Sequence, residues 1–116
     1  MISVIIPVYN EKNTIVEIIN KIKSINIKKE IIIVDDCSTD GTRGILERLK
    51  DADYKILFHD KNLGKGAAIK TAKKKISGDI VIIQDADLEY NPNDYPKLIE
   101  PIFKKEVYVV YGSRVL

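Results

Sequence analysis

The residues best suited to chemistry in this chain are carboxylates that follow short apolar runs. Asp35 and Asp36 come directly after one run, and Asp85, Asp87 and Glu89 come after another. Carboxylates gathered in one place repel each other unless a cation or proton donors neutralise them. Mg²⁺ or Mn²⁺ fits, because carboxylate and phosphate oxygens are the preferred ligands of hard divalent cations. These residues therefore predict a metal site that can also hold a phosphate.

Two further features support a phosphate ligand at this site. The i, i+2 spacing of Asp85 and Asp87 suits the turning end of a strand, where both carboxylates can reach one ligand. Arg114, after the last apolar run, can present a bidentate fork to a phosphate from the opposite side.

The elements that position these residues alternate between strand and helix patterns. Apolar residues recur at helical spacing, as at Ile15, Ile18, Ile19 and Ile22, between short continuous apolar runs. Ser38, Thr39 and Asp40 are candidates for a helix N-cap. The patterns predict strands over residues 2–9, 30–34, 55–58, 79–84 and 107–111, and helices over 13–25, 41–50, 67–76 and 93–104.

The predicted fold class is α/β, with an open, mostly parallel sheet covered by helices on both faces. Strands that are apolar throughout, rather than at alternate positions, are typical of a sheet buried on both sides. Ligands of such sheets bind outside the carboxyl ends of the strands. Residues 7–11, 35–36, 85–89 and 112–114 should therefore converge on one rim.

Five sequence blocks, in order, resemble the glycosyltransferases of family 2, which have the GT-A fold with a Rossmann-like nucleotide-binding half. The resemblance covers the whole chain and is closest to the dolichol- or polyprenyl-phosphate mannosyltransferase branch. The blocks are residues 5–11 (IIPVYNE), 34–42 (VDDCSTDGT), 62–68 (NLGKGAA), 85–87 (DAD) and 112–114 (GSR).

The resemblance implies a nucleotide pocket built by the first three blocks. Pro7, Tyr9 and Glu11 would line it, and Val34 and Asp36 would contact base or ribose. Lys65, in the turn before a helix, is a further candidate for ligand contact.

The resemblance also implies roles for the last two blocks. Asp85 would face ribose or sugar, Ala86 would supply backbone contacts, and Asp87 would bind the metal. Glu89 stands where close relatives carry Gln as a second metal ligand, which adds a negative charge here. Arg114 would contact the diphosphate, so Asp87 and Arg114 are the predicted catalytic residues.

The implied activity is an inverting, metal-dependent transfer of a sugar, with mannose favoured, from a nucleoside diphosphate sugar. GDP-mannose is the favoured donor and a UDP-sugar the alternative; the implied acceptor is a polyprenyl or dolichyl phosphate. The metal and an arginine would stabilise charge on the departing diphosphate. A nucleotide-sugar-binding module without turnover remains open as an alternative. A phosphate acceptor resembling a response regulator is a weaker one, based on Asp35 and Asp36.

The length of 116 residues suits a single domain, 1–116. Family 2 catalytic domains are longer, so the resemblance implies a GT-A domain that lacks the usual acceptor-binding second half. The last strand would then leave an open sheet edge beside Val109, Val110, Val115 and Leu116, which predicts a homodimer.

Composition limits the remaining function classes. A net charge of +2 does not suit a dedicated nucleic-acid binder. Cys37 is the only cysteine, which excludes an internal disulfide and favours a cytoplasmic location, with a space-filling role for the thiol. No signal peptide is visible and the apolar runs are too short to span a bilayer, so membrane contact would be peripheral, at the cytoplasmic face. His59, the lone histidine, is expected to be structural or exposed.

Overall fold

The computed structural model describes residues 1–49, 54–84, 108–111 and 114–115, the last two segments as backbone only. In these residues the strands form one sheet in the order β3-β2-β1-β4-β5-β6. All neighbouring strands are parallel except β5 and β6, which are antiparallel. The strands are β1 (Ile2–Val8), β2 (Lys29–Asp35), β3 (Tyr54–Phe58), β4 (Ile80–Ile83), β5 (Tyr108–Tyr111) and β6 (Arg114–Val115). The helices are α1 (Ile15–Lys23), α2 (Thr42–Arg48) and α3 (Lys65–Lys73).

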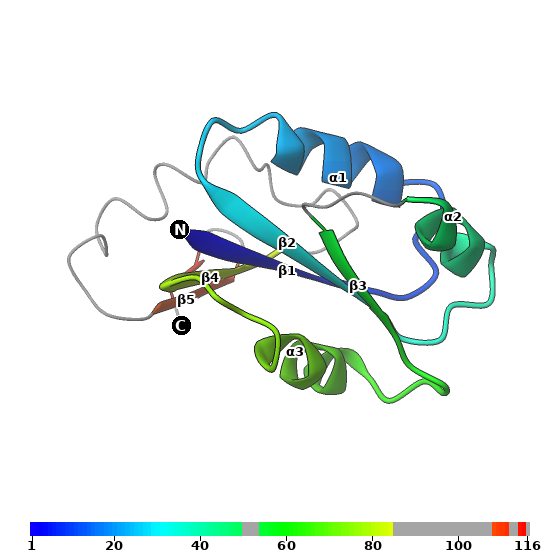
Figure 1. Cartoon of the computed structure of the whole chain (residues 1–116). Coiled ribbons are helices and arrows are strands. Elements are labelled where there is room, and N and C mark those ends of the chain that lie inside the picture. Colours follow the sequence, from blue (N-terminus) through cyan, green and yellow to red (C-terminus); the bar gives the residue numbers. More distant parts are fainter. Residues whose placement is uncertain (50–53, 85–107, 112–113, 116) are drawn as a thin grey trace.

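Helices cover both faces of the sheet, as the apolar strands predict. α1 and α2 lie over one face and α3 lies over the other (Figure 1). Alternate residues of β1 separate accordingly: Val4 and Ile6 belong to the core under α1 and α2, and Ile5 belongs to the core under α3. Side chains of successive strand residues point to opposite faces, so a strand buried on both sides must be apolar at every position. The predicted fold class is confirmed.

The strand order reverses between β1 and β4, which places the strand ends of interest side by side. β1 pairs with β2 on one side and with β4 on the other. Backbone hydrogen bonds continue this order past the strands: Asp36 N–H donates to Val8 O, and Gln84 N–H donates to Ile5 O. The crevice expected at such a switch point lies outside the ends of β1 and β4.

Most predicted boundaries differ from the observed ones by one to three residues. The helix predicted over 13–25 spans Ile15–Lys23, and the one predicted over 67–76 spans Lys65–Lys73. The second of these begins earlier because Gly64, with φ of 96°, is its N-cap. The helix predicted over 93–104 lies outside the described residues.

The prediction of an open edge on the last parallel strand was wrong where β6 pairs. Val110 pairs with Val115, and Tyr111 pairs with Arg114, so a short antiparallel strand covers that part of β5. At Val110 and Tyr111 the backbone of β5 is therefore not open to a second copy of the chain. The homodimer stays a prediction. In the part of the chain that the structure describes, no helix is long and apolar enough to cross a membrane.

Candidate functional site

The loop after β1 and the loop after β2 each donate a hydrogen bond to the other. Asn10 N–H donates to Ser38 Oγ at 2.9 Å, and Thr39 N–H donates to Asn10 Oδ1 at 2.7 Å. Asn10 adopts a φ of 53°, a left-handed conformation that Asn tolerates better than most residues. The first predicted nucleotide-binding block is thus held in one conformation by the second.

Thr42 extends this connection to Glu11. The Glu11 N–H donates to Thr42 Oγ1 at 3.0 Å, and the Thr42 amide and hydroxyl donate to Asp40 Oδ1. Burial alone raises the pKa of Asp40, but hydrogen bonds from Thr42 and from backbone amides, including that of Lys12, together outweigh it and the pKa lies below its usual value. The N-cap of α2 is Gly41, with φ of 103° and no side-chain cap, so the prediction of residues 38–40 as the cap was wrong. The Asp40 side chain is instead part of the turn that leads into the helix.

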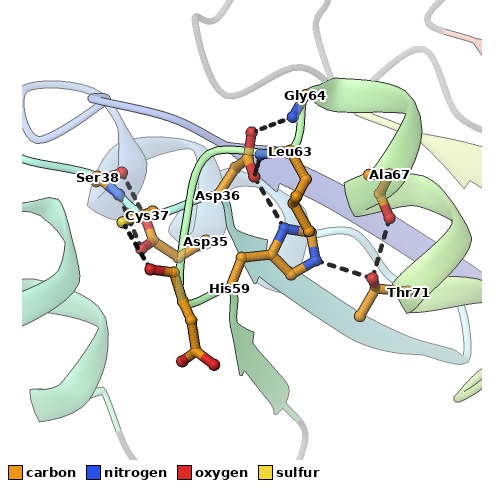
Figure 2. Close-up of polar contacts among 10 residues, drawn as sticks. Asp35, Asp36, Cys37, Ser38, His59, Leu63, Gly64, Ala67 and Thr71 are labelled. Atoms are coloured by element: carbon orange, nitrogen blue, oxygen red, sulfur yellow. Dashed lines mark hydrogen bonds and ion pairs between the residues drawn. The ribbon is translucent and has the colours of Figure 1, made fainter.

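The adjacent carboxylates at the end of β2 serve different loops. Asp35 is fully buried, and its oxygens accept hydrogen bonds from the amide and hydroxyl of Ser38. Asp36 is only 4% exposed and binds the loop before α3, as Figure 2 shows. Its Oδ1 accepts from Leu63 N–H and its Oδ2 from Gly64 N–H, both at 2.8 Å.

His59, at the end of β3, completes the group around Asp36. Its Nδ1 lies 2.8 Å from Asp36 Oδ1, and its Nε2 lies 2.8 Å from Thr71 Oγ1 on α3. Burial pushes the pKa of Asp36 up, but bonds from the Leu63 amide, His59 and the Gly64 amide outweigh it and hold the pKa below its usual value. His59 is 8% exposed, so of the two roles predicted for it, the structural one is confirmed.

The predicted nucleotide-binding residues differ in how much surface they offer. Tyr9 is 46% exposed just past β1, Pro7 and Glu11 are half-buried, and Lys65 is exposed at the first position of α3. Val34 is fully buried in the core under α3, so its side chain has no surface with which to meet a base or ribose. Three protein donors already occupy the Asp36 carboxylate, so its direct contact with a nucleotide stays a prediction.

The predicted metal and phosphate ligands follow the switch point in the sequence. Gln84 is fully buried, and its backbone N–H donates a hydrogen bond to Ile5 O of β1. The next residue in the chain is Asp85. Asp85, Ala86, Asp87 and Glu89 lie outside the described residues; Arg114 is described only as backbone, opposite Tyr111. Within the described ranges no three His, Cys, Asp or Glu residues are grouped to hold a metal. The metal site therefore remains a prediction on Asp87 and Glu89.

Comparison with known proteins identifies the family. Residues 3–116 match the model of glycosyl transferase family 2. The chain belongs to this family.

Relatives and solved structures agree with the family assignment. The dolichol-phosphate mannosyltransferase of Pyrococcus furiosus is 36% identical over 97% of the chain and 33% of its own length. The mannosyltransferase PcManGT from Pyrobaculum calidifontis, solved with GDP-Man and Mn²⁺, has a TM-score of 0.72 and 32% identity over 80% of this chain and 29% of its own. The S. aureus TarS fragment 1–349, solved with UDP, has a TM-score of 0.72 and 30% identity over 86% of this chain and 32% of its own. The chain thus spans about a third of the length of these proteins.

The hydrogen-bonded group of Asp36, His59 and Thr71 was missed from sequence. Its members are far apart in the chain and follow no motif spacing. The available signal was that Asp36 and His59 each directly follow a strand of the predicted parallel sheet, so they would lie at neighbouring strand ends if those strands were adjacent.

Proposed function

We propose that this chain is the donor-binding half of an inverting, metal-dependent glycosyltransferase. The donor is a nucleoside diphosphate sugar, with GDP-mannose favoured, and the acceptor is a polyprenyl or dolichyl phosphate. The observation that carries the proposal is the switch point: β1 and β4 are paired neighbours, and Gln84, the residue before the acidic triplet, is hydrogen-bonded to β1. Ligands of such sheets bind outside the strand ends at a switch point.

Within this proposal, the described rim supplies the nucleotide pocket. Tyr9, which is 46% exposed, would offer its ring to the nucleotide, and the half-buried Pro7 and Glu11 would form the rest of the pocket wall. The bonds of Asn10 to Ser38 and Thr39 keep this wall in place before the donor arrives. A wall fixed in advance loses less conformational freedom on binding, which favours affinity.

Asp87 and Glu89 would hold the cation, as hard oxygen donors that suit Mg²⁺ or Mn²⁺. The cation, when bound, supplies positive charge against the diphosphate as that group departs. Arg114 would bind the diphosphate through its planar guanidinium, and Asp85 would face the ribose or sugar, with Ala86 contributing backbone. An acceptor phosphate is already ionised at neutral pH, so the transfer needs no strong general base.

The identity of the donor is argued from the relatives. Two of the compared proteins are mannosyltransferases, one of them solved with GDP-Man and Mn²⁺, which favours GDP-mannose. TarS was solved with UDP, so a UDP-sugar is the alternative donor. A lipid phosphate acceptor would place the protein in peripheral contact with the cytoplasmic face of the membrane, where we propose it acts, as a homodimer.

A binding module without turnover is the second candidate. It is favoured by one observation: the chain spans only about a third of the length of these relatives, whose transfer activity belongs to the longer proteins.

A product assay separates the two candidates. The chain is incubated with Mn²⁺, a polyprenyl phosphate and GDP-mannose, UDP-glucose or UDP-GlcNAc, and the glycolipid is measured. The transferase predicts product with GDP-mannose and none after Asp87→Ala. Donor binding without product would favour the module, and binding of no nucleotide at all would contradict both.

Sedimentation of the same sample tests the dimer, which a strict monomer at high concentration would contradict.

A further inference from the structure

A buried chain of hydrogen bonds joins the end of β2, the end of β3 and helix α3. It runs from Asp36 through His59 and Thr71 to the carbonyl of Ala67 (Figure 2). The side chains of Asp36 and His59 are only 5% and 8% exposed, so water cannot readily replace these bonds. The positions of the protons along the chain can therefore be counted from the partners present.

The count begins at Asp36, whose carboxylate accepts hydrogen bonds and donates none when ionised. Two backbone amides point at it, from Leu63 and Gly64, and both can only donate. These donors favour the ionised form, so the third partner, His59 Nδ1, must carry a proton.

The count continues at Thr71, whose hydroxyl has a single proton. Thr71 Oγ1 lies 3.0 Å from Ala67 O, which can only accept, so the hydroxyl proton belongs to that bond. The hydroxyl oxygen then accepts from His59 Nε2, which must also carry a proton. Only the doubly protonated ring satisfies every contact at once; a neutral ring requires the Thr71 hydroxyl to leave Ala67 O.

We propose that His59 is an imidazolium and acts as a positioning residue for the donor site. Its bonds to Asp36 and Thr71 fix the carboxylate that holds the amides of Leu63 and Gly64. Those amides set the loop that leads to Lys65 at the start of α3, within the third block that resembles the family. The consequence for donor binding rests on the proposed function, whereas the charge on the ring does not.

The charge on the ring can be measured directly, because His59 is the only histidine in the chain. A two-dimensional ¹H–¹⁵N spectrum of the imidazole, recorded at pH 7 without ligand, reports the protonation of each ring nitrogen. We expect both nitrogens of the wild type to have the shifts of protonated nitrogen. One unprotonated nitrogen would overturn the proposal.

The positioning role is tested by the pair Thr71→Val and Thr71→Ser, with Lys70→Ala as the control. Valine removes the acceptor for Nε2–H, serine keeps it, and Lys70 is an exposed neighbour on the same helix. We expect Thr71→Val to give a neutral ring and faster hydrogen exchange at the Leu63 and Gly64 amides, and Thr71→Ser and Lys70→Ala to give wild-type spectra and exchange.

The same variants then report on the donor site, with GDP and UDP as probes in the presence of Mn²⁺. Thr71→Val should weaken nucleotide binding about three- to tenfold, the range set by one net hydrogen bond, and Thr71→Ser should restore it. Wild-type affinity in Thr71→Val, with both amides still protected, would overturn the positioning role. A wild type that binds neither nucleotide would instead count against the proposed function, and the ring spectrum would still decide the charge.

Discussion

Replacing Asp36 by Asn should lower the free energy of unfolding by about 3 kcal/mol at pH 7. The carboxylate accepts three hydrogen bonds of 2.8 Å, from His59, Leu63 and Gly64. Asn has a single side-chain oxygen, so at least one of these buried donors faces an NH₂ group and loses its partner. An unmet buried donor costs about 1–3 kcal/mol, and loss of the charge weakens the other bonds by about 1 kcal/mol more.

The pH dependence of this loss follows from the pKa of Asp36. The folded pKa lies below the ordinary value of 3.8, so the stabilisation by the carboxylate is fully present above that value. It is lost as the pH falls through the lower, folded pKa. The difference between wild type and Asp36→Asn should therefore shrink as the pH falls below about 4, where the carboxylate becomes protonated.

Urea unfolding followed by circular dichroism, at pH 7, 5, 4 and 3, measures this difference. Asp79→Asn is the matched control, because Asp79 is an exposed aspartate just before β4, and it should change stability by less than about 0.5 kcal/mol. A loss for Asp36→Asn below about 1 kcal/mol at pH 7 would contradict this prediction, as would a loss that does not shrink between pH 5 and pH 3.

Other positions give independent tests, each read from urea or thermal unfolding. A Cβ on Gly78 would lie 2.6 Å from Ser3 Oγ and 2.7 Å from Met1 O, so Gly78→Ala should cost about 1–3 kcal/mol; a neutral effect would mean that β1 and β4 begin further apart. Ile18 is fully buried on the inner face of α1, so Ile18→Ala should cost about 2–5 kcal/mol. Val16 is exposed on the same helix, so Val16→Ala should cost under about 0.5 kcal/mol. Equal effects would contradict the assigned helix face. Asn10→Ala removes the acceptor of the Thr39 N–H and leaves alanine in a left-handed φ, so it should cost about 1–2 kcal/mol. It should also speed hydrogen exchange of the Thr39 amide. Unchanged exchange at that amide would contradict the coupling of the two loops.

The sheet and its helices could be predicted from sequence because their pattern is strong. Continuous apolar runs such as 31–34 leave few alternatives to a strand buried on both faces, and Ile15, Ile18, Ile19 and Ile22 fit only one face of a helix. The strand β6 could not be predicted in this way, since it has two residues and no periodicity.

Only the part of the candidate site that lies within the family motifs could be predicted from the sequence. The exposure of Tyr9 and the meeting of the β1 and β2 loops follow from the fold. The burial of Val34 and the bonds of Asp36 to His59 depend on which side chain faces the core and on contacts 23 residues apart, and neither has a local signature. The motif pattern placed Asp36 near the nucleotide, and the structure adds that it organises the loop before α3.

The proposed function requires a divalent cation on Asp87 that holds a nucleotide sugar near the end of β4. Its most direct test is calorimetry of GDP-mannose binding with and without Mn²⁺, in wild type, Asp87→Ala and the control Asp79→Ala, an aspartate near the opposite end of the same strand. We expect Mn²⁺ to increase the affinity for GDP-mannose equally in wild type and in Asp79→Ala. In Asp87→Ala this increase should be at least about tenfold smaller. Binding that ignores Mn²⁺, or that survives Asp87→Ala unchanged, would contradict the account.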